Sequence, residues 1–222
     1  MIAVVIDDMG LNRTLSRRAV AMKGLTLSYL PYGEDLPAQT AEARAAGHEL
    51  LVHISMAPEG RENAGPNALT PGLPADEIAR RLDWALGRFT GYVGINNHMG
   101  SRFTADEKGM TEVLTHLKSR GLLFLDSRTT AHTVGPIVAH RLGVPLAERS
   151  VFLDNVETVD AVRRQLVELE AAARRDGMAI AIGHPKEPTL TALEAWLEQA
   201  PSRGFVLVPL SAIVRRNLTA RG

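Results

Sequence analysis

The chain has 222 residues, a length that suits one domain or one compact α/β barrel. Its 25 Lys and Arg balance 25 Asp and Glu, which removes the usual electrostatic reason to expect nucleic acid or an anionic membrane surface as a partner. Cysteine is absent, and this excludes disulfides, thiolate metal sites and a cysteine nucleophile.

Short apolar runs alternate with longer amphipathic segments along the chain. The first run, at 2–6, is too short and too poor in basic residues for a signal peptide or a membrane span, so we expect a strand there. Apolar runs without polar alternation are typical of strands buried on both faces, as in parallel sheets. Eight strands are predicted in this way, at 2–6, 25–30, 50–53, 92–95, 122–125, 151–153, 178–182 and 205–208.

The amphipathic segments predict helices at 12–23, 37–46, 75–88, 156–175 and 189–200. A further helix is expected to open at Thr104, where a capping-box pattern reaches Glu107, and to end near Gly121. Its predicted apolar face consists of Met110, Val113, Leu114 and Leu117. The segment 57–74, rich in Pro, Gly and Asn, is expected to be a binding loop or lid.

Alternation of strands and helices over 1–222 predicts a single α/β domain, either a wound parallel sheet or a closed (β/α) barrel. Both folds place their binding sites at the carboxyl ends of the strands. Acidic, amide and histidine side chains follow most of the predicted strands, and burying them unpaired would be costly. We therefore expect them to meet around a shared ligand. The residues at these strand exits are Asp7, Asp8, His53, Asn96, Asn97, His98, Ser101, Asp126, Ser127, Asp154 and His184.

One carboxylate and two imidazoles at such exits are ligands suited to zinc or a similar divalent ion, and three ligands leave a position open for water. A second carboxylate can then act as general base, and another histidine as general acid. The alternative to ligand binding for Asp126 and Asp154 is a structural role, in which each forms a turn or caps a helix. The four histidines without a strand-exit placement are excluded; they are His48, His116, His132 and His140.

Five segments in this order resemble the divergent polysaccharide deacetylases, distant relatives of the NodB-type carbohydrate esterases. They are Ile-Asp-Asp-Met-Gly at 6–10, His-Glu-Leu-Leu-Val-His at 48–53, Asn-His-Met-Gly-Ser at 97–101, Leu-Asp-Ser at 125–127 and Gly-His-Pro at 183–185. The resemblance covers essentially the whole chain. It implies a distorted (β/α) barrel with seven or eight mostly parallel strands, and a periplasmic or cell-envelope setting. The implied activity is removal of acetyl groups from an N-acetylated polysaccharide or amino sugar by attack of metal-bound water.

The resemblance also implies roles for individual residues. Asp7 matches the general base, and His184 matches the histidine that protonates the leaving amine. Asp8 and His53 match metal ligands for a divalent ion, with zinc expected. The family's second metal histidine follows the first by four residues, and Ala57 stands there in this sequence. His98 is the natural replacement by placement. Four further strand-exit residues are expected to bind substrate, namely Asn97, Ser101, Asp126 and Ser127.

Two other functions compete with a deacetylase. A catalytically silent glycan-binding module of the cell envelope would keep the barrel and the metal, and the missing second histidine favours it. Retention of both Asp7 and His184 speaks against that module, which needs neither a base nor an acid. Another metal hydrolase, such as a phosphatase, ranks last because no Gly-rich phosphate loop opens a helix.

Overall fold

The computed structural model describes residues 1–219, and eight parallel strands in one sheet form its centre. The order across the sheet is β6-β5-β4-β3-β2-β1-β8-β7. The strands are β1 (Ile2–Met9), β2 (Thr26–Tyr29), β3 (Glu49–Met56), β4 (Tyr92–Met99), β5 (Leu123–Asp126), β6 (Leu146–Glu148), β7 (Val151–Phe152) and β8 (Ala179–Gly183).

The sheet is curled into a distorted (β/α) barrel, as predicted. Its two edge strands, β6 and β7, are consecutive in the chain and are separated only by Arg149 and Ser150. Two residues span roughly 10 Å between the flanking residues at most, so the opposite edges of the sheet must lie close together. The edges share no ladder of hydrogen bonds within residues 1–219, and a seam therefore runs down one side of the barrel.

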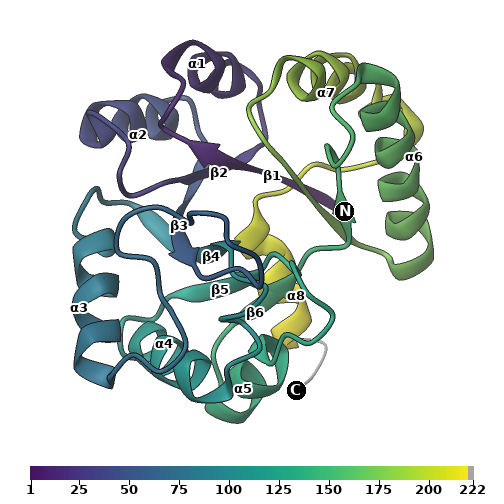
Figure 1. Cartoon of the computed structure of the whole chain (residues 1–222). Coiled ribbons are helices and arrows are strands. Elements are labelled where there is room, and N and C mark those ends of the chain that lie inside the picture. The colour runs from purple at the N-terminus through teal and green to yellow at the C-terminus, as the bar shows by residue number, and fades with distance from the viewer. Residues whose placement is uncertain (220–222) are drawn as a thin grey trace.

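Helices surround the curled sheet on its outer side (Figure 1). A large apolar layer joins them to the outward-facing strand residues, such as Ile2, Val4 and Ile6 of β1. The helices are α1 (Arg13–Ala21), α2 (Leu36–Ala45), α3 (Ala75–Leu86), α4 (Glu107–Ser119), α5 (Gly135–Leu142), α6 (Val159–Asp176), α7 (Glu187–Gln199) and α8 (Leu210–Thr219).

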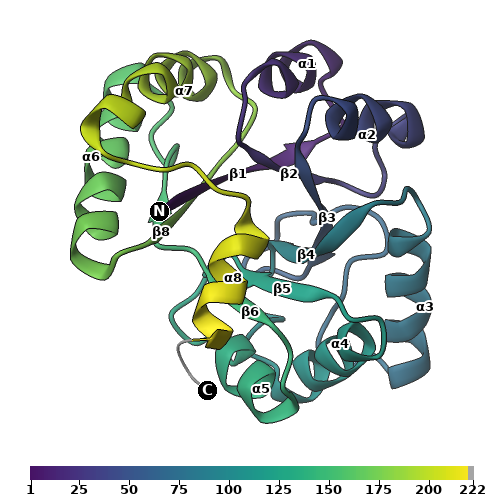
Figure 2. The same ribbon diagram turned by 180° about the vertical axis from the view of Figure 1, so that it is seen from behind.

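The last helix, α8, lies apart from this ring and covers one mouth of the barrel, as the view from behind shows (Figure 2). Its first backbone N–H groups donate to the side chains of Thr26 and Glu49, the first residues of β2 and β3. It therefore closes the amino ends of the strands. A second core fills the barrel interior, where α8 contributes Leu210, Ile213 and Val214. The opposite mouth, at the carboxyl ends, is left for polar side chains.

Two predicted segments differ from the structure. The segment 205–208 is not a strand: it pairs with β1 only at Ile2, which donates a backbone hydrogen bond to Val206 and accepts one from Val208, and Pro209 ends the run. The helix predicted from Thr104 begins at Glu107 instead, because the Thr104 hydroxyl donates to the Gly100 carbonyl rather than capping the helix. Its predicted apolar face is buried as expected.

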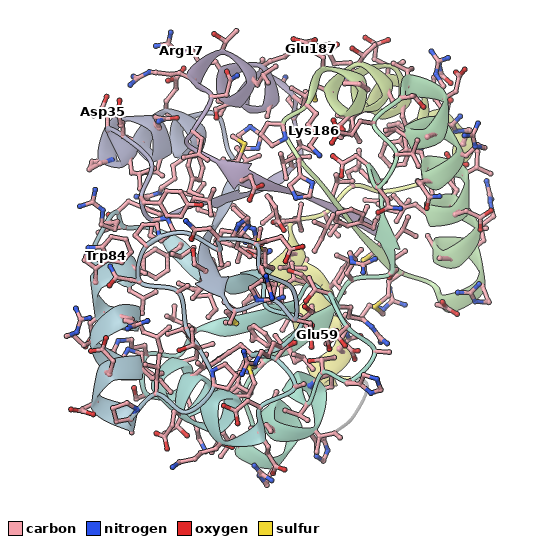
Figure 3. All side chains as sticks on the ribbon, in the orientation of Figure 1. Arg17, Asp35, Glu59, Trp84, Lys186 and Glu187 are labelled. Atoms are coloured by element: carbon pink, nitrogen blue, oxygen red, sulfur yellow. The ribbon has the colours of Figure 1, made fainter. Side chains whose placement is uncertain are left out.

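The loop over 57–74 passes in front of β3 and β4 in Figure 1, and Figure 3 places its Glu59 over the front of the molecule, well inside the outer edge where Trp84 lies. Leu69 ties the loop to the sheet through bonds to Ala57 and Ser55. In the described part of the chain, no helix is long and apolar enough to cross a membrane.

Candidate active site

The end of β1 carries a bulge that turns two neighbouring aspartates toward the same place. The pairing of β1 with β2 shifts register between Ile6 and Met9, and Asp8 adopts a left-handed backbone conformation with φ of 52°. A non-glycine residue in that region is strained and is typical of functional sites. Without the bulge Asp7 and Asp8 would point to opposite faces of the strand. The bend allows both carboxylates to reach the barrel mouth, as the sequence predicted.

Asp8, His53 and His98 come together although three different strands supply them. Asp8 Oδ1 lies 2.9 Å from His98 Nδ1 and 3.3 Å from His53 Nε2, and the two nitrogens are 3.3 Å apart. Ligand atoms about 2.0–2.1 Å from a tetrahedral ion are about 3.3 Å from one another. Asp8 Oδ1 is also buried and lacks a hydrogen bond of good geometry. The three ligand atoms therefore fit a divalent metal ion.

The side chain of Asn96 forms hydrogen bonds to two residues of the site, Asp7 and His53. Its Nδ2 group donates to both carboxylate oxygens of Asp7, at 2.8 and 3.0 Å, and its Oδ1 atom lies 2.8 Å from His53 Nδ1. Ser28 donates to the same Oδ1 atom at 2.5 Å. Since a carbonyl oxygen only accepts, His53 carries a proton on Nδ1, and its Nε2 atom faces Asp8. Such an outer partner is what fixes the tautomer of a metal-binding histidine.

His184 is held at the exit of β8 by Asp154 from the exit of β7. Asp154 accepts from the His184 backbone N–H at 2.7 Å, and its other oxygen lies 2.9 Å from His184 Nδ1. Thr189 also donates to Asp154 at 2.8 Å, so the carboxylate is fully engaged. His184 Nε2 is thereby turned toward Asp8, with 3.9 Å between Nε2 and Asp8 Oδ2.

Burial and charge shift the pKa values of the two predicted catalytic groups upward. Burial raises the pKa of the Asp7 carboxyl, and the opposing effects of His53, His184 and Asn96 do not cancel the rise. Burial by itself lowers the pKa of His184, but the Asp154 carboxylate outweighs it and the net pKa is raised. A carboxylate of raised pKa is a better general base, and a histidine of raised pKa keeps a proton to donate.

The pKa of Asp8 is shifted downward by the two imidazoles of the candidate metal-binding trio, which consists of Asp8, His53 and His98. Burial raises the pKa of Asp8, but His53 and His98 outweigh it and the net pKa is lowered. Asp8 is therefore ionised, as a metal ligand must be.

The site opens into a cavity of about 950 Å³ at the carboxyl ends of the strands. Asp7, Asp8, His53, His98 and His184 all line it, together with the predicted substrate-binding residues Asn97 and Ser127. The volume is that of a pocket for a drug-sized or larger ligand.

The structure places two predicted substrate-binding residues elsewhere. Asp126 is fully buried, and its oxygens accept from the Arg128 backbone N–H and the Thr133 hydroxyl, so it forms the turn that was its alternative interpretation. Ser101 accepts a hydrogen bond from Glu59 N at 2.9 Å and anchors the 57–74 loop. Neither residue lines the cavity, and no described residue of that loop lines it either.

Asn96 and Asp154 have no predicted catalytic, metal-binding or substrate-binding role. Both stand at strand exits, and a turn or a helix cap is the alternative interpretation for Asp154. The available signal for both was their position directly after an apolar run, the same signal that identified the histidines.

Comparison with known proteins identifies the family of the chain. A family model for divergent polysaccharide deacetylases matches residues 4–214, and the chain belongs to that family. It is 35% identical over 214 residues to the uncharacterized protein YibQ of Escherichia coli K12, covering 96% of this chain and 67% of YibQ. It is 34% identical over 201 residues to an uncharacterized protein of Haemophilus influenzae, covering 90% of this chain and 72% of the relative.

Solved structures share the fold. An uncharacterized protein from Agrobacterium tumefaciens C58 superposes with a TM-score of 0.93 at 32% identity, over 96% of this chain and 88% of that one. The catalytic domain of a peptidoglycan N-acetylglucosamine deacetylase from Eubacterium rectale gives 0.59 at 15% identity, over 94% and 87% of the chains. A mutant of a CE4 family pseudoenzyme from Bacillus anthracis gives 0.62 at 12%, over 96% and 67%. The last two likenesses concern the fold alone.

Proposed function

We propose that the protein is a metal-dependent hydrolase that removes acetyl groups from an N-acetylated polysaccharide or amino sugar. One observation carries the proposal: Asp7 and His184, both of raised pKa, lie within 4 Å of the trio that fits a metal. Hydrolysis of an amide needs a base for water and an acid for the departing nitrogen. Membership of the divergent polysaccharide deacetylase family supports the proposed substrate class.

Asp8, His53 and His98 would hold the ion, which would supply Lewis-acid polarisation and a more acidic water when bound. Asp7 takes the proton of the water that adds to the acetyl carbonyl carbon. His184 then gives its proton to the nitrogen as the carbon–nitrogen bond breaks, and acetate and the free amine leave. Asn96 keeps Asp7 in place during the first step, and Asp154 keeps His184 in place during the second.

The test is acetate release from N-acetylglucosamine oligomers, together with the zinc content of the same samples after reconstitution. We expect Asp7→Asn to keep zinc and lose about 10²–10⁴-fold in kcat, because only the proton acceptor is removed. Asp8→Ala should lose both zinc and activity. His116→Gln, on the outer helix α4, is the matched control and should change neither. Full activity in Asp7→Asn would refute the assignment of the base.

A silent glycan-binding module is the second candidate, and Ala57 favours it. Ala57 stands where the family pattern has its second metal histidine, and the chain shares its fold with a CE4 family pseudoenzyme. Such a module should bind N-acetylglucosamine oligomers equally well in the wild type, Asp7→Asn and His184→Asn, and should release no acetate in any of them. We also propose a periplasmic or cell-envelope location, which fractionation of cells and immunodetection would test.

A further inference from the structure

The cavity continues beyond the acidic and histidine residues to the seam between β6 and β7, where three arginines line it. These are Arg128, Arg149 and Arg175. An adjoining hollow of about 530 Å³ is lined by the same three side chains and by Ser150, so one continuous depression runs from the reaction centre to the seam. Carboxylates and imidazoles occupy one end, and the three guanidinium groups occupy the other together with the carboxylate of Asp176.

Ion pairing distinguishes the three arginines. Arg128 lies 2.8 Å from Glu148. Arg175 lies 2.8 Å from Asp176 and is also attracted by the charge of Glu168. Arg149 has no carboxylate in contact among the described residues. Its Nε donates to the Ser127 carbonyl at 2.7 Å and its Nη2 to the Arg128 carbonyl at 2.8 Å. Asp126 and Asp7 act on its charge from a distance, but no carboxylate pairs with it directly.

The guanidinium of Arg149 is fixed in position with part of its donor capacity unused. Two backbone carbonyls hold one edge, and the ring of Phe152 lies 5.2 Å from its central carbon. A guanidinium has five N–H donors, so the Nη1 edge is free for a ligand. Burial and the neighbouring Arg128 lower the pKa of Arg149, because water solvates this charge poorly. A half-buried, unpaired charge of this kind costs free energy unless an anion joins it.

We propose that Arg149 binds an anionic group on the substrate, and hence that the glycan is acidic. The group would be a carboxylate, or a phosphate or sulfate ester, on a sugar next to the N-acetylated one. Oxyanions of this shape match the planar guanidinium fork and form its strongest hydrogen bonds. The orientation of the acetyl group toward Asp7 and His184 rests on the proposed deacetylase function, whereas anion binding at the seam does not.

An alternative role for Arg149 is to position Asp7 by electrostatic attraction, since the two charges interact. The Asp7 oxygens, however, are held by Asn96, and no hydrogen bond joins Arg149 to Asp7 in the described chain. Another alternative is purely structural, because Arg149 ties the Ser127–Arg128 turn to the seam. Both alternatives predict equal losses on neutral and acidic substrates, and this difference makes the proposal testable.

The experiment compares kcat/KM for two oligosaccharides of equal length: N-acetylglucosamine alone, and N-acetylglucosamine alternating with glucuronic acid. We expect the wild type to prefer the acidic oligosaccharide. Arg149→Gln should lose about 10- to 100-fold on it, the usual effect of a charged hydrogen bond, and about twofold or less on the neutral one. Arg141→Gln is the matched control and should leave both rates unchanged, because Arg141 is an exposed arginine of α5 that bonds to Glu107 of α4. Phosphorylated and sulfated N-acetylglucosamine oligomers show which anion is preferred.

Equal losses on both substrates, or no preference in the wild type, would overturn the proposal. If Arg149→Gln fails to fold, the wild-type preference must still weaken as ionic strength rises, because salt screens partly exposed charges. A preference that salt leaves unchanged would also overturn it. Calorimetric binding of the two oligosaccharides separates this proposal from the deacetylase. Tighter binding of the acidic one without acetate release would refute the deacetylase and retain the subsite.

Discussion

Asn96 links the proposed base to the metal site through a single amide. Its N–H donors face the Asp7 carboxylate, so its carbonyl oxygen must face His53, and the His53 proton is thereby placed on Nδ1. Asn96 is fully buried, and its neighbours would be left with unpaired polar atoms if it were removed. An unpaired buried group costs about 1–3 kcal/mol, so the residue is a positioning residue for two others at once.

Replacing Asn96 should therefore weaken metal binding without touching a ligand. We expect Asn96→Ala to reduce zinc affinity about 10- to 100-fold, as loss of an outer-shell partner commonly does. Competition with a coloured chelator measures this directly. Thr40→Val is a suitable control, because it removes a buried hydroxyl that bonds to its own helix at Leu36. Unchanged zinc affinity in Asn96→Ala would show that His53 needs no outer partner.

The sequence identified the site residues where a simple local signal existed. His53, His98 and His184 each follow an apolar run, and the structure brings all three to one cavity. No role was predicted for Asn96 because its partner Asp7 is 89 residues away in the sequence, and only the pairing of strands shows that the two side chains face each other. For Asp126 the same strand-exit signal was misleading. It satisfies a local turn, and no pattern in the sequence separates that role from ligand binding.

At the scale of elements, the helix α8 was not predicted from the sequence. Its apolar residues pack into the barrel interior against inward-facing residues of β1, β5 and β8, such as Val5, Leu125 and Ile182. Those strands read as uniformly apolar, which shows burial on both faces but not what fills the inner face. The three-residue strand β6 was also not predicted. Its Leu-Ala-Glu sequence is too short and too mixed to stand out from a loop.

Because α8 plugs the mouth opposite the site, its packing should affect stability and not chemistry. We expect Ile213→Ala to lower the free energy of unfolding by about 2–5 kcal/mol, the usual range for a buried large-to-small change. Ile213 is only 1% exposed. Chemical denaturation measures the loss, and the kcat of the remaining folded protein should be unchanged. Val206→Ala, at a side chain 62% exposed, serves as the control and should cost about 0.5 kcal/mol or less.

At the scale of the whole molecule, the barrel is a sheet that curls without closing. Hydrogen-bonded ladders run continuously from β6 through β1 to β7, and within the described residues only the Arg149–Ser150 connection and packing hold the edges together. The predicted metal ligands come from β1, β3 and β4, which are joined through β2 in the middle of that ladder. A bound ion would thus cross-link strands whose ligands are separated by up to 90 residues along the chain, from Asp8 to His98.

An ion that binds the folded chain and not the unfolded one stabilises the fold by mass action. At a free zinc concentration of a hundred times Kd the gain is about 2.7 kcal/mol, which for a chain of this length raises Tm by about 5–10 °C. We expect this rise in the wild type and in Asp7→Asn, where the three ligands are intact, and its absence in Asp8→Ala. Differential scanning calorimetry with and without a chelator measures it. An equal rise in Asp8→Ala would mean that zinc binds elsewhere, and the trio would then be a set of buried polar groups without a metal.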